Sequence, residues 1–216
     1  ACTFPAEADC LSELDGLASL LEAHDVRVLR PEVLDDLNQI FARDVGVVID
    51  DRLVATRMIS DRAAEWHGIA PLLQGVRDSH VLTPPEGVRV EGGDVMPMNG
   101  ELWVGHSAAA DFATFTTSRT NEAALDWLSD QYTDWRIRGF ELAKSDDDPR
   151  ANALHLDCCL SVLAGGHAIF HANGLKHEED RALIRSRFEG KLLEVNADQM
   201  YDMQCNLISI TPEDVV

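Results

Sequence analysis

The sequence is organised around one segment, Asn152-Ala-Leu-His155-Leu-Asp157-Cys158-Cys159, which places a histidine, a carboxylate and two thiols in an otherwise apolar run. Such a run predicts a buried strand over residues 153–163. Side chains alternate along a strand, so His155 and Asp157 would point to one face. The pair is then either a hydrogen-bonded structural pair of the core or a catalytic base beside an acid.

The segments around this stretch repeat one order of elements, a hairpin followed by a helix and a strand. Hairpin turns are predicted at Asp50-Asp51-Arg52, at Asn99-Gly100 and near Gly165-Gly166, and Cys205–Ile210 predicts the first arm of a fourth hairpin. The remaining predicted elements are helices at 9–24 with Asp9 as N-cap, 60–73, around 124–132, 177–189 and 197–203, and strands at 26–29, 80–82, 135–142 and 192–195. This repetition predicts an α/β protein built from similar units.

Each predicted unit begins with charged side chains at the start of its first strand: Asp44, then Glu91 and Asp94, then His155 and Asp157. If the units surround an axis, these groups converge on one central pocket. Carboxylates that converge need a cation, because like charges raise each other's pKa. A planar guanidinium can pair with two or three carboxylates at once, and a metal ion is the alternative.

The net charge and the cysteine content limit the kinds of molecule that the protein is expected to bind and the compartment in which it is expected. The net charge is -20, from 18 Lys and Arg against 38 Asp and Glu, which argues against nucleic-acid or anionic-membrane surfaces. An acidic surface also fits adaptation to salt or simple solubility. Five cysteines without C-x-x-C spacing indicate neither a disulfide framework nor a zinc ribbon, so a reducing, cytoplasmic location is expected. No stretch has the roughly 18 apolar residues of a membrane span, and the first residues lack the basic and apolar regions of a signal peptide.

Four motifs in order resemble the pentein superfamily of guanidino-group-modifying enzymes, which includes arginine deiminases, dimethylarginine hydrolases and glycine amidinotransferases. Residues 38–44 resemble the deiminase segment N-x-x-F-x-R-D, and residues 91–94 resemble E-G-G-D. Residues 118–121, Ser-Arg-Thr-Asn, resemble a segment whose arginine holds the substrate carboxylate, and residues 155–157 resemble H-L-D.

This resemblance implies a fold and a role for each matching residue. The implied fold is a five-fold pseudo-symmetric α/β propeller, with residues 1–216 as a single catalytic domain truncated at both ends. The implied roles are substrate contact for Asn38 and Asp44, guanidinium binding for Glu91 and Asp157, support for Asp94, binding of the substrate carboxylate for Arg119, and general acid and base for His155.

The chemistry that the resemblance implies is attack of a cysteine thiolate on the guanidinium carbon, with a covalent amidino intermediate. Water then gives a ureido product, whereas an amine gives amidino transfer. H-L-D, in place of the H-L-K of some dimethylarginine hydrolases, favours an arginine-type deiminase or an amidinotransferase. The nucleophile is expected beyond Val216, because Cys158 and Cys159 lie on the wrong side of H-L-D and Cys205 matches no nucleophile segment.

Two alternatives stay open. One is a non-catalytic pentein that only binds, since the fold also serves as a ribosome-binding factor. The other is a metal-dependent hydrolase using Glu91, Asp94, His155 and Asp157. We expect no cofactor and no metal, because the candidate ligands lie on separate units without local spacing such as H-x-x-x-H. The expected partner is a small guanidino substrate, and a propeller left unclosed at Val216 would expose sheet edges and favour a homo-oligomer.

Overall fold

The computed structural model of the chain describes residues 5–216. Its strands are β1 (Gly46–Ile49), β2 (Arg52–Ala55), β3 (Val81–Leu82), β4 (Val95–Met98), β5 (Glu101–His106), β6 (Arg136–Glu141), β7 (Leu160–Leu163), β8 (His167–Phe170) and β9 (Leu192–Glu194). Its α-helices are α1 (Glu7–Ala23), α2 (Ala42–Val45), α3 (Trp66–Ile69), α4 (Ala109–Thr114), α5 (Ala123–Gln131), α6 (Glu178–Arg187) and α7 (Ala197–Tyr201).

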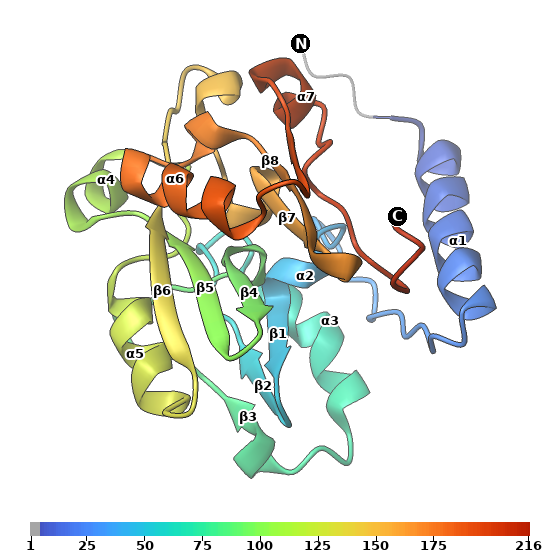
Figure 1. Cartoon of the computed structure of the whole chain (residues 1–216). Coiled ribbons are helices and arrows are strands. Elements are labelled where there is room, and N and C mark those ends of the chain that lie inside the picture. Colours follow the sequence, from blue (N-terminus) through green and yellow to red (C-terminus); the bar gives the residue numbers. More distant parts are fainter. Residues whose placement is uncertain (1–4) are drawn as a thin grey trace.

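The described strands form three sheets of three strands, in the orders β1-β2-β3, β4-β5-β6 and β7-β8-β9 (Figure 1). In each sheet the first two strands pair antiparallel as a hairpin, and the third pairs parallel with the second after a helical connection. The predicted repetition of hairpin, helix and strand is therefore confirmed for three units. A mixed α/β fold follows, and closure into five units stays a prediction.

The predicted hairpin turns contain residues suited to them. Asn99 and Gly100 both have positive φ, 43° and 85°, and they join Met98 directly to its cross-strand partner Glu101. A two-residue turn with positive φ at both positions matches the right-handed twist of the strands it joins. In the first hairpin only Asp50 has positive φ, 56°, and aspartate tolerates this region better than most residues.

The middle unit is shared by two hydrophobic clusters, because side chains alternate along β5. Leu102 and Val104 pack with Ile49 and Val54 of the first unit, and Trp103 packs on the opposite side with residues of the third unit. The Trp103 ring meets Phe140 edge-on, with the ring centroids 5.2 Å apart. The second sheet thus holds the other two units in place on its two faces.

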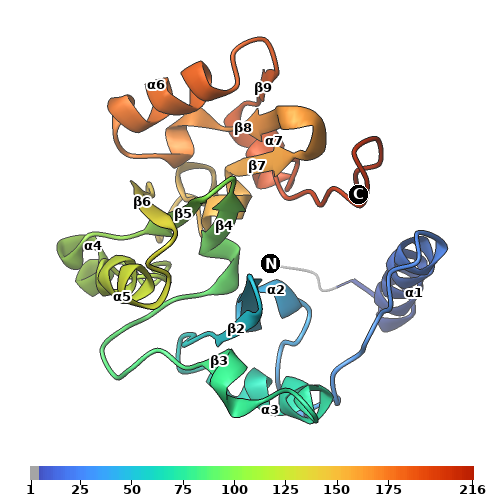
Figure 2. The same cartoon turned by 60° about the horizontal axis from the view of Figure 1, so that its bottom comes forward.

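Helix α1 forms close to its predicted bounds but does not pack as an amphipathic helix. It begins at Glu7, and Asp9 is not its N-cap. No residue of α1 is buried, and Leu11 is 50% exposed. Figure 2 shows α1 standing away from the three sheets. None of the helices in the described range is long and apolar enough to cross a membrane.

Some predicted elements are wrong. Residues 26–29 are irregular, and Cys205–Ile210 contains no strand but only an isolated antiparallel bridge between Ser209 and Val215. The helical segment from Ser60 is broken into α3 and short 3-10 turns, as expected where Pro71 interrupts it. Residues 107–118 contain α4, a helix that is absent from the predicted elements.

Candidate active site

Three short turns, each preceding the first strand of a unit, lie against one another. They are α2 before β1, the 3-10 turn Gly92–Asp94 before β4, and the 3-10 turn Leu156–Cys158 before β7. A Cβ atom on Gly93 would lie 2.8 Å from Asp44 Oδ1, 3.0 Å from His155 Cγ and 3.1 Å from Asp157 Oδ1. Gly93 therefore lies at the point where charged groups from the three units meet, and only glycine leaves room for them.

His155 and Glu91 pair directly within this cluster. The His155 Nε2 atom lies 2.9 Å from Glu91 Oε2, and Glu91 Oε1 accepts a hydrogen bond of 3.1 Å from the Ile59 amide. Burial lowers the pKa of His155, but nearby carboxylates, Asp94 first among them, outweigh it and raise this pKa well above its usual value. Burial raises the pKa of Glu91, but the bond to His155 outweighs it and lowers this pKa. The pair is therefore an imidazolium and a carboxylate.

Asp94 supports the turn that carries Asp157. Its Oδ1 atom accepts a hydrogen bond of 2.9 Å from the Leu156 amide, and its Oδ2 atom has no hydrogen-bond partner among the described residues. Burial raises the pKa of Asp94 to about 6, although the charge of His155 opposes this rise. An aspartate that is hard to ionise is consistent with a residue surrounded by protein on all sides.

Asp44 and Asp157 carry the remaining carboxylates of the cluster. Asp44 Oδ1 lies 3.7 Å from His155 Nδ1 and accepts a bond of 3.2 Å from the Gly93 amide. Asp157 Oδ2 pairs with Arg43 Nε at 2.9 Å. Burial is the main cause of the raised pKa of Asp157. Both carboxylates are thus buried, and each keeps one oxygen toward Gly93.

Arg119 reaches the cluster from the segment before α5. Its Nε atom lies 3.9 Å from Glu91 Oε2, and its NH1 group donates to the carbonyl of Thr116 at 2.7 Å. Asn38 is not brought into the cluster: its side chain is exposed and accepts a bond of 3.4 Å from the Ile40 amide. The convergence of Asn38 on the cluster therefore stays a prediction.

Arg62 and Glu65 belong to this region, and the sequence reading assigned them only to a helix. Arg62 NH1 lies 2.6 Å from Asp44 Oδ2 and 3.9 Å from Glu91 Oε2. The same guanidinium donates two bonds of 2.8 Å to Glu65, whose side chain is 1% exposed. The sequence did contain a signal for this pair. An arginine and a glutamate stand three positions apart in an otherwise apolar helical segment, and charged residues are rarely buried without a specific role.

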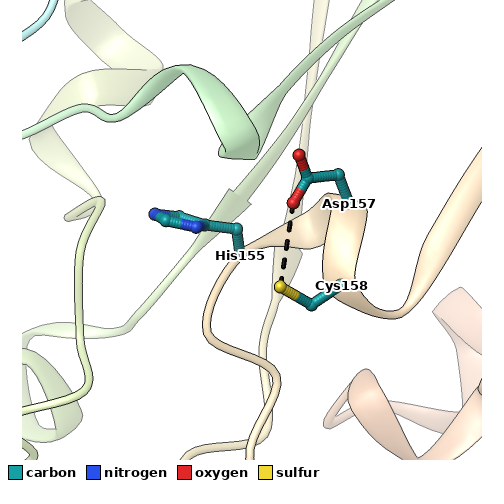
Figure 3. Close-up of side chains that lie close together, drawn as sticks. All are labelled: His155, Asp157 and Cys158. Carbon is teal, nitrogen blue, oxygen red and sulfur yellow. Dashed lines mark hydrogen bonds between the residues drawn. The ribbon is translucent and has the colours of Figure 1, made fainter. Parts of the chain in front are cut away.

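The segment around Asp157 forms a turn and not the predicted strand. Strand β7 begins only at Leu160, and Leu156–Cys158 forms a 3-10 turn instead. Such a turn has three residues per turn, so residues three apart lie on the same side. Cys158 consequently lies beside the motif, with Sγ 3.8 Å from Asp157 Oδ1 (Figure 3). Strand alternation would have turned Cys158 away from His155 and Asp157, whereas the turn brings one ligand atom of each residue within 4.8 Å of the others.

A cavity of about 320 Å³ lies between the first sheet and α3, and none of the clustered carboxylates lines it. Its lining is mostly apolar and includes Val48, Leu53, Trp66 and Ile69. Asp51 is the one carboxylate in this lining, and it lies 3.4 Å from His80, so the cavity does not gather several carboxylates around one cation. The charged cluster is therefore the stronger candidate for chemistry.

The raised pKa of Asp94 predicts a pH-dependent stability. The folded state holds this proton more tightly than the unfolded state, so its contribution to stability falls as the pH rises from about 4 through about 6. The rise of the pKa from 3.8 to about 6 corresponds to about 3 kcal/mol. In urea unfolding, we expect Asp94→Asn to gain that amount relative to the wild type between pH 4 and pH 7. Parallel pH curves would contradict this, and Asp147→Asn, on an exposed loop, is the control.

Comparison with known proteins gives one family and many solved structures. Residues 5–215 match the family described as "N,N dimethylarginine dimethylhydrolase, eukaryotic". No curated protein matches the sequence.

The solved structures share the fold at low sequence identity. The N-terminal domain of ArgZ, an arginine dihydrolase from cyanobacteria solved as a mutant bound to substrate, has a TM-score of 0.77 at 18% identity; the match covers 95% of this chain and 71% of that chain. DDAH from Pseudomonas aeruginosa, a mutant complexed with citrulline, has a TM-score of 0.74 at 18% identity over 98% and 73% of the two chains. AgrE, in a ternary complex with ornithine and NAD+, has a TM-score of 0.75 at 19% identity over 95% and 28%.

Proposed function

The chain belongs to the N,N dimethylarginine dimethylhydrolase family of the pentein superfamily of guanidino-group-modifying enzymes, and from that premise we propose that it hydrolyses a C–N bond in the guanidino group of arginine or a methylated arginine. The observation that carries this proposal is the meeting of Asp44, Glu91 and Asp157 with His155 around Gly93. These carboxylates come from three units far apart in the sequence, and converging like charges are stabilised by a cation.

A guanidinium is the cation that fits these carboxylates. Its planar, forked donors can pair with several carboxylates at once, whereas an ammonium is a point charge. The protein's own Arg62 illustrates the pairing, because its guanidinium contacts Asp44 at 2.6 Å and lies 3.9 Å from Glu91. We assign the substrate guanidinium to Asp44, Glu91 and Asp157.

Asp44, Glu91 and Asp157 together form a clamp for the guanidinium. The α-carboxylate of the substrate needs a positive partner beside this clamp. Arg119 has this position, since its guanidinium is 3.9 Å from Glu91 and its side chain is only 14% exposed. Arg62 adds a second guanidinium at the same distance from Glu91. We therefore assign the α-carboxylate to Arg119, with Arg62 completing the positive wall; Asn38 stays a candidate for substrate contact only.

The proposed reaction has two steps. A cysteine thiolate forms a bond to the guanidinium carbon, and the amine leaves with a proton from His155. Water, losing a proton to the neutral His155, then attacks the same carbon, so a ureido product and the free thiol form. Transfer to a second amine in place of water is the amidinotransferase alternative, and hydrolysis is the reaction in the name of the matching family.

The nucleophile is assigned to no cysteine described here. Burial raises the pKa of the Cys159 thiol well above its usual value and the pKa of Cys205 to about 12, so neither supplies a thiolate at neutral pH. From the resemblance to penteins, we expect the nucleophile in a fifth unit.

Calorimetric titration of the chain with arginine and methylated arginines tests the clamp. We expect Asp157→Asn to weaken binding by about 1.5 to 3 kcal/mol, because it removes one charged acceptor from the guanidinium. Asp147→Asn, which replaces an exposed aspartate in the same way, should bind like the wild type. Equal affinities for both variants, or no preference for guanidino over amino compounds, would reject the proposal.

A further inference from the structure

Arg119 lies between a buried residue that is held by the clamp and an exposed turn. On the side after it, Thr120 is buried, and its hydroxyl accepts a hydrogen bond of 3.2 Å from the Glu91 amide. On the side before it, the NH1 group of Arg119 donates to the carbonyls of Thr116 at 2.7 Å and Ser118 at 3.1 Å. Thr116 is exposed, so the position of its carbonyl depends on other contacts of the turn.

Those contacts come from the loop that follows β6. The carboxylate of Asp146 accepts a hydrogen bond of 3.0 Å from the Thr116 amide on one oxygen and another of 3.0 Å from the Thr117 amide on the other. The bond from the Thr116 amide is the main cause of the lowered pKa of Asp146, which is therefore ionised at neutral pH. Asp146 thus restrains two consecutive residues of the turn whose carbonyl binds Arg119.

The start of this loop is fixed by Lys144. Its Nζ group donates hydrogen bonds of 2.8 Å to the carbonyls of Ala153 and Leu154, and it reaches the Thr117 carbonyl at 3.5 Å. An ammonium has three donors, and these three carbonyls accept them. Ala153 and Leu154 directly precede His155. Lys144 therefore ties the turn at Thr117 to the segment that carries the proposed general acid and base.

A fixed position of Arg119 matters for the choice of substrate. In arginine, a chain of fixed length separates the guanidinium from the α-carboxylate, so the clamp and Arg119 must keep a matching distance. Arginine side chains lose rotamer freedom when they are held, and holding Arg119 before the substrate binds removes that cost from binding. Among residues 5–216, only the NH1 group of Arg119 donates hydrogen bonds, which leaves its NH2 group for a carboxylate.

We propose that Asp146 is a positioning residue for Arg119 and thereby makes the site select guanidino compounds that carry an α-carboxylate. The inference rests on the proposed function, because it requires the substrate guanidinium in the clamp. Asp146 acts on the substrate through the Thr116 carbonyl and the Arg119 guanidinium, and Lys144 holds the loop from which it acts.

Calorimetric titration with arginine and with agmatine, which is arginine without its carboxylate, tests this role. We expect Asp146→Ala to weaken arginine binding about 10-fold, the lower end for loss of a hydrogen bond to a charged group, and to leave agmatine binding unchanged. Asp146→Asn should weaken arginine binding less, because its amide oxygen still accepts a bond from the turn. Asp147→Ala, the same change at the neighbouring exposed residue, should bind both compounds like the wild type.

A double-mutant cycle separates positioning from a general loosening of the fold. In an Arg119→Ala background, Asp146→Ala should change the arginine affinity no further, because the residue through which it acts is absent. Circular dichroism checks that each variant is folded.

Three results would overturn the inference and leave the guanidino function standing. They are equal effects of Asp146→Ala on both compounds, including no effect on either, a further loss in the Arg119→Ala background, and a wild type that binds arginine no better than agmatine. A wild type that binds neither compound would reject the proposed function, and the inference with it.

Discussion

Replacing His155 with alanine is expected to reduce turnover by about 10² to 10⁴-fold, the usual contribution of a general acid and base, in a form of the protein that carries the nucleophilic cysteine. Guanidino compounds should still bind. His155 acts on protons in the transition state, whereas the carboxylates act on the charge of the bound substrate. Removing the imidazolium next to Glu91 also leaves the clamp more negative, which favours a cationic ligand.

Rates of ureido-product formation and calorimetric affinities, measured on the same preparation, check this expectation. Added imidazole should restore part of the lost turnover, because it can carry the proton in the space that the side chain leaves. If His155→Ala loses arginine binding as completely as Asp157→Asn does, His155 is a structural partner of the carboxylates. The interpretation of the pair as a structural pair of the core would then be correct.

Replacing Gly92 with alanine is expected to destabilise the protein by about 3 kcal/mol or more, a large part of the total stability of a typical domain. A Cβ atom at this position would lie 2.0 Å from the Arg43 carbonyl oxygen and 3.1 Å from its carbon. Both atoms belong to the backbone of α2, so no side-chain rotation relieves the overlap. The first two units would have to separate at the turn that carries Asp44.

Urea unfolding measures this effect, and Gly16→Ala is the matched control. Gly16 lies within α1, and a Cβ atom there meets nothing within 4 Å. The control should stabilise α1 by about 1 kcal/mol, the difference in helix propensity between the two residues. Unchanged stability of Gly92→Ala would mean that the two units do not approach as closely as described here.

The repeated hairpins could be predicted because their signals are local. Asn99-Gly100 permits a tight turn by its own backbone preferences, and the alternating apolar residues of β5 need only two faces to bury. The acidic and basic residues at the start of each unit were visible for the same reason. Their spacing of 50 positions between Asp44 and Asp94 repeats the length of a unit.

The sequence by itself therefore determined the order of the units and the charged residues at the start of each unit. Only the tertiary structure decided which of these residues touch. Arg62 and Glu65 join the cluster because the 3-10 turn before α3 places Arg62 beside Asp44. Cys158 joins it because the hydrogen bond of Asp94 with the Leu156 amide favours a 3-10 turn over a strand. Local sequence preferences cannot predict a hydrogen bond between residues 62 positions apart, because the free energy that favours the turn comes from the neighbouring unit.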